Sequence, residues 1–144
     1  MHMKLTSNDF MNNELMDKKF SYRGGNISPH LKWDDIPNDT KSFALSCNDP
    51  DAPIGDWIHW YVINIPKNIQ EIPQGGPIPG EELKNDYGQK GYGGPAPPSG
   101  THRYFFRIYA LDQEKLKDVN KKTFQDTIKK HSIAAGELIG LYKS

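Results

Sequence analysis

The segment Ile58–Ile65 reads IHWYVINI, a run of aromatic and β-branched residues that follows Asp56 closely and ends at Pro66. Such a run between Asp and Pro is typical of a β-strand. Alternation along a strand gives two faces, which carry Ile58, Trp60, Val62 and Asn64 on one side and His59, Tyr61, Ile63 and Ile65 on the other. Because both faces are largely apolar, we expect this strand to be covered on both sides, as at the centre of a packed sheet.

Two further runs, Phe43–Asn48 and His102–Leu111, share this composition and predict two more core strands. In the second run one face carries Tyr104, Phe106, Ile108 and Ala110. The opposite face begins with Arg103, which needs an acidic partner if it is buried.

The last third of the chain predicts one helix and one strand. Leu116–Lys130 is the best helix candidate, with Thr123 as its N-cap. Ile133–Tyr142 is ambiguous, but Gly136 and Gly140 weaken a helix, and small residues alternate with bulky ones. We therefore expect a final strand.

The composition limits the class of protein. The chain has 144 residues, with 18 Lys+Arg against 18 Asp+Glu, so we expect a single domain over residues 1–144 with zero formal charge. This balance excludes a nucleic-acid binder that relies on attraction to phosphates. No apolar run reaches the ~18–20 residues of a membrane span and no signal pattern is visible, so a cytoplasmic location is expected.

Several single residues receive a structural interpretation. Cys47 is the one cysteine, so no internal disulfide can form, and its apolar surroundings in the sequence predict a core residue. His30 and His131 are interpreted as structural. Met1-His2 ahead of Met3 resembles a cloning remnant, and His2 is left out of the candidate sites.

The segment Pro66–Thr101 joins the second and third predicted strands and is rich in glycine and proline. A loop of this length inside a compact domain is usually either functional or a mistaken assignment. Glycine lets the backbone approach a ligand closely, and proline limits the entropy lost on ordering, which suits the rim of a small pocket. An inert surface excursion is the alternative.

Three polar clusters lie at the ends of the predicted strands, at residues 49–53, 57–60 and 100–104. If the three strands are neighbours, Asp49, His59 and His102 converge on one pocket. Two imidazoles offer hydrogen-bond donors to a small anion such as phosphate, and the Tyr104 hydroxyl is a further donor.

Other chemistries fit this pattern less well. Two histidines and a carboxylate suggest a metal-dependent hydrolase, but the chain has no HxH, HxD or HExxH spacing. Acyl transfer is not indicated, because no G-x-S-x-G motif is present. Each histidine alone is better explained as a hydrogen-bonded core residue. No convincing catalytic constellation emerges, so the chain is expected to be no enzyme and to need no metal or cofactor.

Three ordered motifs mark these strand ends: Asp49-Pro50-Asp51-Ala52-Pro53, then Trp57-x-His59-Trp60 leading into Val62-Ile63-Asn64-Ile65-Pro66, then Gly94-Pro95-x-Pro97-Pro98-x-Gly100-x-His102-Arg103-Tyr104. Supporting motifs are Asn26-Ile27-Ser28-Pro29 with Leu31-x-Trp33, and Ala135-x-Glu137-Leu138-x-Gly140-x-Tyr142. Through them the chain resembles the phosphatidylethanolamine-binding protein (PEBP) family, in particular its bacterial and archaeal Raf-kinase-inhibitor-like branch. The match extends from Leu5 to Tyr142, nearly the whole chain.

This resemblance implies an all-β fold, a Greek-key antiparallel β-sandwich with a few short peripheral helices. It implies an anion pocket formed by Asp49, Pro53, Trp57, His59, Gly94, Pro95, His102 and Tyr104. It also implies a structural ion pair between Asp51 and Arg103 that holds two loops together.

The function implied is binding of phosphate or of the phosphorylated head group of a phospholipid. A second possibility is inhibition of a serine protease or kinase through surface loops such as residues 73–98. The chain ends at Ser144, without the carboxy-terminal helix of longer eukaryotic members, so kinase regulation does not transfer. Prokaryotic relatives are commonly homodimers, and the zero net charge of this chain does not oppose self-association into a homodimer.

Overall fold

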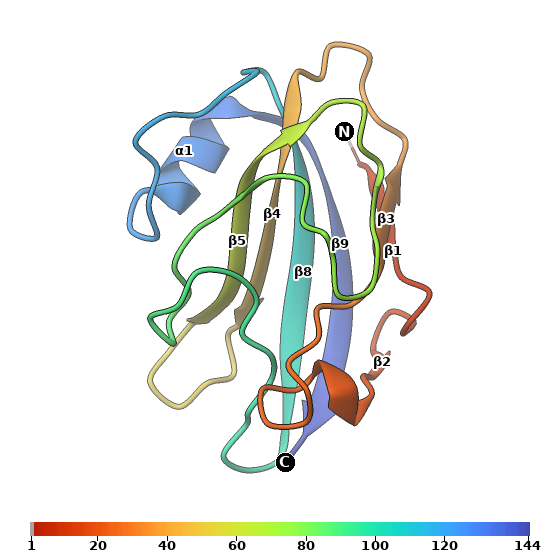
Figure 1. The fold of residues 1–144 in the computed structure, drawn as a ribbon, viewed down its shortest axis with the longest axis vertical. Coiled ribbons are helices and arrows are strands. Elements are labelled where there is room, and N and C mark those ends of the chain that lie inside the picture. Colours follow the sequence, from red (N-terminus) through yellow and green to blue (C-terminus); the bar gives the residue numbers. More distant parts are fainter. Residues whose placement is uncertain (1) are drawn as a thin grey trace.

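The IHWYVINI segment forms the central part of β5 (Trp57–Pro66) in the computed structural model, which describes residues 2–144 (Figure 1). This strand belongs to a six-stranded sheet with the order β2-β9-β8-β4-β5-β7. The other members are β2 (Glu14–Leu15), β4 (Ser42–Asp49), β7 (Glu81–Glu82), β8 (Thr101–Leu111) and β9 (Ser132–Lys143). The three predicted core strands and the predicted final strand are confirmed. All pairings in this sheet are antiparallel except that of the short β2 with β9.

A second, three-stranded sheet has the order β1-β3-β6, formed by β1 (Lys4–Thr6), β3 (Leu31–Asp34) and β6 (Glu71–Ile72). The chain leaves β5, adds β6 to this sheet, and returns through β7 to β8, which lies beside β4 and not beside β5. Such an out-of-sequence return is typical of Greek-key connections. The predicted mainly β fold with few short helices is confirmed.

The central strand is covered on both faces, as its sequence predicts. Between the two sheets, Trp60 and Val62 pack in one core cluster with Trp33 and other fully buried residues. On the other face, Tyr61 and Ile63 pack in a second cluster with Phe124 and Ile128 of the α-helix. The apolar face of β8 that carries residues 104, 106, 108 and 110 also lies in the first cluster.

Two positions of β5 lie on the opposite face from the one that simple alternation predicts. Ile58 packs in the cluster of Tyr61, whereas Ile65 packs in the cluster of Trp60. The register with β4 shifts at two places, because His59 is an extra residue at one of them and Asn64, with φ 57°, lies at the other. A β-bulge reverses the alternation beyond it and aims its extra residue away from the regular ladder.

The helix α1 (Phe124–His131) is shorter than predicted, and it begins at Phe124 instead of Leu116. The Asn64 side chain exchanges two hydrogen bonds with the backbone of Leu116, at 2.7 and 3.2 Å, which fixes that segment outside a helix. The predicted N-cap position is confirmed, because Thr123 directly precedes the first helical residue. Its side chain makes no cap hydrogen bond, and the Asn120 side-chain oxygen instead accepts from the backbone N–H groups of residues 122 and 123.

Among residues 2–144, no helix is both long and apolar enough to cross a membrane.

Candidate functional site

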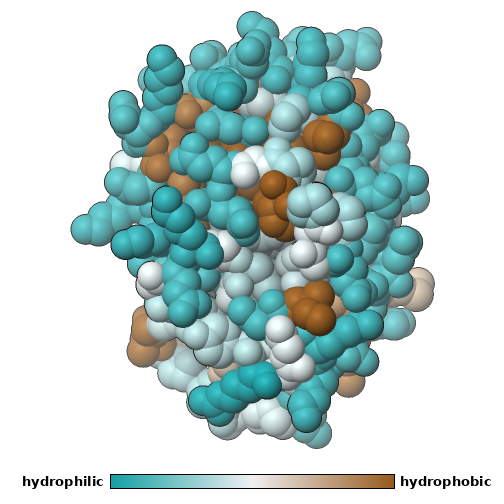
Figure 2. All heavy atoms as spheres, viewed as in Figure 1, coloured by the Kyte–Doolittle hydropathy of each residue, from teal (hydrophilic) through white to brown (hydrophobic). Residues whose placement is uncertain are grey.

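The antiparallel register brings the end of β4 together with the beginnings of β5 and β8. A pocket of about 370 Å³ lies at this end of the sheet. Its lining residues are Tyr22, Arg23, Asp49, Ala52, Pro53, Ile54, Trp57, His59, Tyr87, Ala96, Pro97, Pro98 and Tyr104. In Figure 1 the loops that carry them gather at the lower end, and Figure 2 shows pale surface of intermediate hydropathy in the lower part of the molecule.

His59 reaches the pocket because it is the extra residue of a β-bulge. Its Nδ1 lies 2.6 Å from the carbonyl oxygen of Gly93. A carbonyl oxygen can only accept, so Nδ1 carries the hydrogen and Nε2 of the neutral ring is an acceptor. Burial lowers the pKa of His59, which favours this neutral form. The ring meets that of Tyr104 edge-on, with 5.1 Å between centroids.

Asp49, the last residue of β4, is buried at the base of the pocket. Its Oδ2 lies 2.6 Å from His102 Nδ1, and its Oδ1 accepts from the backbone N–H of Asp51 at 2.8 Å. A carboxylate has about four acceptor positions, so each oxygen can take a further hydrogen bond. His102 is itself buried and orients this carboxylate without being one of the lining residues.

Asp51 and Arg103 form an ion pair beside the pocket. Arg103 donates to the Asp51 carboxylate from its backbone N–H, from Nε and from a terminal NH₂, each at 2.9 Å. The pair joins the β4–β5 loop to β8. The possibility that Arg103 is buried is wrong, because 52% of its side chain is exposed. The Arg103 side-chain hydrogen bonds lower the pKa of Asp51 to about 2.

Replacing Asp51 with asparagine is expected to lower the free energy of unfolding by about 1 kcal/mol at neutral pH, since the pair is partly exposed to solvent. The folded-state pKa is depressed, so the contribution is complete above the ordinary value of 3.8 and disappears as the pH falls through about 2. Thermal unfolding from neutral to acid pH measures this. The difference between wild type and Asp51→Asn should shrink below about pH 4, whereas the exposed Asp118→Asn control should show no such difference. A stability difference between wild type and Asp51→Asn that stays constant with pH would contradict the ion pair as its cause.

Two buried donors of the pocket have no partner among the described residues: the Trp57 Nε1–H and the Tyr104 hydroxyl. Tyr104 is fully buried, and burial raises the pKa of its hydroxyl, which keeps the proton in place. Buried polar groups in proteins are nearly always paired, with protein, water or ligand. Both donors therefore suit a ligand that presents acceptor oxygens.

The structure brings five of the predicted pocket residues together: Asp49, Pro53, Trp57, His59 and Tyr104. Gly94 and Pro95, like His102, do not line the pocket and instead hold residues that do. The Gly94 carbonyl accepts from the Tyr87 hydroxyl at 2.8 Å, and the Pro95 carbonyl accepts from Tyr22 N–H at 2.9 Å. Gly94 is required by close approach, because a Cβ there would lie 2.1 Å from a backbone oxygen of Phe20.

Sequence reasoning missed the rim of the pocket. Tyr22 and Tyr87 stack with 4.1 Å between ring centroids. Arg23, which follows Tyr22, is exposed and is the only described lining residue with a permanent positive charge. Tyr87 lies in the glycine- and proline-rich segment interpreted as a pocket rim, a signal that could have found it. Nothing in the sequence around Tyr22 distinguishes it.

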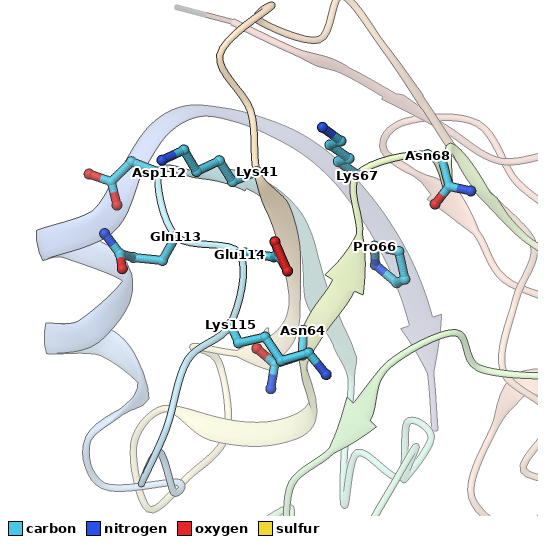
Figure 3. Close-up of a pocket in the computed structure, with 9 residues that line it drawn as sticks. All are labelled: Lys41, Asn64, Pro66, Lys67, Asn68, Asp112, Gln113, Glu114 and Lys115. Atoms are coloured by element: carbon cyan, nitrogen blue, oxygen red, sulfur yellow. The ribbon is translucent and has the colours of Figure 1, made fainter.

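A larger hollow of about 670 Å³ lies near the other ends of β4 and β5 (Figure 3). Its polar side chains come from the ends of those strands and from residues 112–115. They include both lysines and acids, and Asn64 is already bonded to the backbone of Leu116. None of the buried unpartnered donors of the described residues lies here, so the smaller pocket is the better candidate site.

Within residues 2–144, no group of three or more His, Cys, Asp or Glu side chains is placed to hold a metal ion.

Comparison with known proteins gives concordant results. The family profile described as phosphatidylethanolamine-binding protein matches residues 6–143. A UPF0098 protein of Methanothermobacter thermautotrophicus is 40% identical over 149 residues, covering 98% of this chain and 99% of its own. The UPF0098 protein YbhB of Escherichia coli is 44% identical over 128 residues, covering 79% of this chain and 81% of its own.

Two solved structures resemble the whole chain. The first is E. coli YbcL, described as a new member of the mammalian PEBP family, with a TM-score of 0.93, 31% identity and coverage of 100% of this chain and 99% of that one. The second is CT736 of Chlamydia trachomatis, described as a putative PEBP homolog, with a TM-score of 0.92 and 38% identity. It covers 99% of this chain and 98% of its own.

Proposed function

The chain belongs to the phosphatidylethanolamine-binding protein family, and from this premise we propose that its pocket binds a small phosphorylated or otherwise anionic ligand. Phosphate, or the phosphorylated head group of a phospholipid, has the required chemistry.

The observation that carries this proposal is the pair of unpartnered buried donors, Trp57 Nε1–H and Tyr104 O–H. An oxygen of the ligand that accepts from them replaces hydrogen bonds that both groups would make to water in the unfolded chain. Arg23 at the rim adds a positive charge that attracts an anion. The surrounding Trp and Tyr rings and prolines give the rest of the ligand an apolar, rigid wall.

The experiment is the thermal stabilisation of the protein by inorganic phosphate, because a ligand that binds only the folded state raises its unfolding temperature. Wild type should be stabilised in a concentration-dependent manner. Tyr104→Phe should weaken binding by about tenfold or more, since it removes one hydrogen bond to a charged ligand and leaves the ring in place. The matched control is Tyr109→Phe, which removes a hydroxyl of the same strand near Ser46 and away from the pocket. Equal stabilisation of wild type and Tyr104→Phe would contradict the proposed site.

A further inference from the structure

The pocket combines donors with a carboxylate, which is unusual for a site that receives an anion. Asp49 lines the pocket and is 3% exposed. Its two known partners, His102 and the Asp51 N–H, occupy one acceptor position on each oxygen. The remaining lone pairs of the Asp49 carboxylate can only accept hydrogen bonds. A ligand oxygen without a hydrogen is therefore repelled by the negative charge of this carboxylate and cannot form a hydrogen bond with it.

His59 adds a second acceptor to the same cavity. Its Nδ1–H is committed to the Gly93 carbonyl, so Nε2 of the neutral ring accepts. The pocket thus offers two groups that donate, Trp57 and Tyr104, and two that accept, Asp49 and His59. A ligand complementary to this set must donate as well as accept.

On the premise of the proposed anion binding, we propose that Asp49 is the specificity-determining residue of the pocket and that a proton is held between its carboxylate and an oxygen of the ligand. The ligand class is then inorganic phosphate or a phosphomonoester that carries one acidic hydrogen. Its remaining oxygens accept from Trp57 and Tyr104.

The proposed role of Asp49 predicts different affinities for ligands of similar shape and charge. Sulfate is close to phosphate in size, but it carries no proton near neutral pH and leaves Asp49 without a donor. A phosphodiester without an amino group has no acidic hydrogen either. A phosphomonoester has its second pKa near about 6, so a proton is available at small cost.

The first experiment titrates wild type by calorimetry with phosphate, methyl phosphate, sulfate, dimethyl phosphate and glycerophosphoethanolamine at about pH 7.5, where methyl phosphate is mostly dianionic. Phosphate and methyl phosphate should bind on the order of 100-fold more tightly than sulfate and dimethyl phosphate, because an unpaired buried charge is penalised strongly. Equal affinity for phosphate and sulfate would overturn the role of Asp49 and leave anion binding intact. Absence of binding by all five compounds would overturn the proposed function, and the inference with it.

The glycerophosphoethanolamine arm distinguishes a lipid head group from a phosphomonoester. An ammonium group can also donate to a carboxylate. If this diester binds more tightly than methyl phosphate, the donor to Asp49 is the ammonium, and the phosphomonoester assignment is wrong.

The matched variant is Asp49→Asn, which replaces an acceptor by a donor of the same shape. Its side-chain oxygen can still accept from the Asp51 N–H, and the His102 tautomer can change to accept from the amide. Asp49→Asn should bind sulfate at least as tightly as phosphate, whereas the exposed Asp118→Asn control should keep the wild-type preference. A phosphate preference that survives in Asp49→Asn would contradict the proposal.

A second measurement needs no variant. The enthalpy of methyl phosphate binding, compared in buffers of different ionisation enthalpy, gives the number of protons taken up. At about pH 7.5 wild type should take up close to one proton, because the ligand is free mainly as the dianion. Uptake near zero would overturn the shared proton.

Discussion

Replacing Phe124 with alanine is expected to lower the free energy of unfolding by about 3–5 kcal/mol. Phe124 is fully buried, and its ring stacks on Tyr61 with 3.7 Å between centroids. It is the first residue of α1 and fixes the helix over the outer face of β5. Urea unfolding of wild type and variant measures the loss.

The control is Phe105→Ala, the same chemical change in β8 of the six-stranded sheet against which α1 packs. Phe105 is only partly buried, between Arg103 and Arg107, so its loss should be clearly smaller. Figure 1 places α1 at the upper end of the sheet and the pocket loops at the lower end. Phosphate should therefore stabilise the folded Phe124→Ala variant as it does wild type. If Phe124→Ala lowers the free energy of unfolding by less than about 2 kcal/mol, the other residues of the second cluster pack together without this ring, and the prediction is wrong.

The strands could be predicted because their residue types are dictated by local chemistry. β5 and β8 are filled with aromatic and β-branched side chains, and their ends are marked by proline, glycine or polar residues. The bulges at His59 and Asn64 could not be predicted, because a register shift depends on the partner strand and not on the segment itself. The predicted beginning of the helix at Leu116 was wrong for a related reason. The side chain of Asn64, far away in sequence, fixes the backbone of Leu116 outside the helix.

The site was only partly predictable for the same physical reason. Motifs at the strand ends identify Asp49, His59 and Tyr104, which the sheet register brings to one end. The rim residues Tyr22 and Arg23 come from a segment that no strand pairing connects to the pocket. They reach it through a hydrogen bond from Tyr22 N–H to the Pro95 carbonyl and through stacking of Tyr22 on Tyr87, both in the connection between β7 and β8. Such contacts leave no pattern in the sequence.

Lowering the pH is expected to tighten the binding of sulfate to the pocket while it destabilises the unliganded protein, and both effects should depend on His59. Burial lowers the pKa of this ring below 6.5, although the Gly93 carbonyl and the carboxylates of Asp49 and Asp86 oppose the shift. The folded state then binds a proton less readily than the unfolded state, so the stability that the neutral ring retains near pH 7 decreases as the pH falls below 6.5.

Bound sulfate reverses this preference, because protonation turns His59 Nε2 from an acceptor into a donor and adds a positive charge beside the anion. Linkage then requires sulfate affinity to rise by up to about tenfold for each pH unit over the range in which binding takes up one proton. Calorimetric titrations and thermal unfolding between neutral and mildly acid pH measure the two trends. His59→Gln, which can still donate to the Gly93 carbonyl but does not titrate, should lose both, whereas His131→Gln, whose ring pairs with Asp112 beside α1, should keep them. If sulfate affinity rises equally in wild type and in His59→Gln as the pH falls, the proton that is taken up binds to a group other than His59. Asp49 would then be the first residue to test, because it lines the same cavity and raises the pKa of His59.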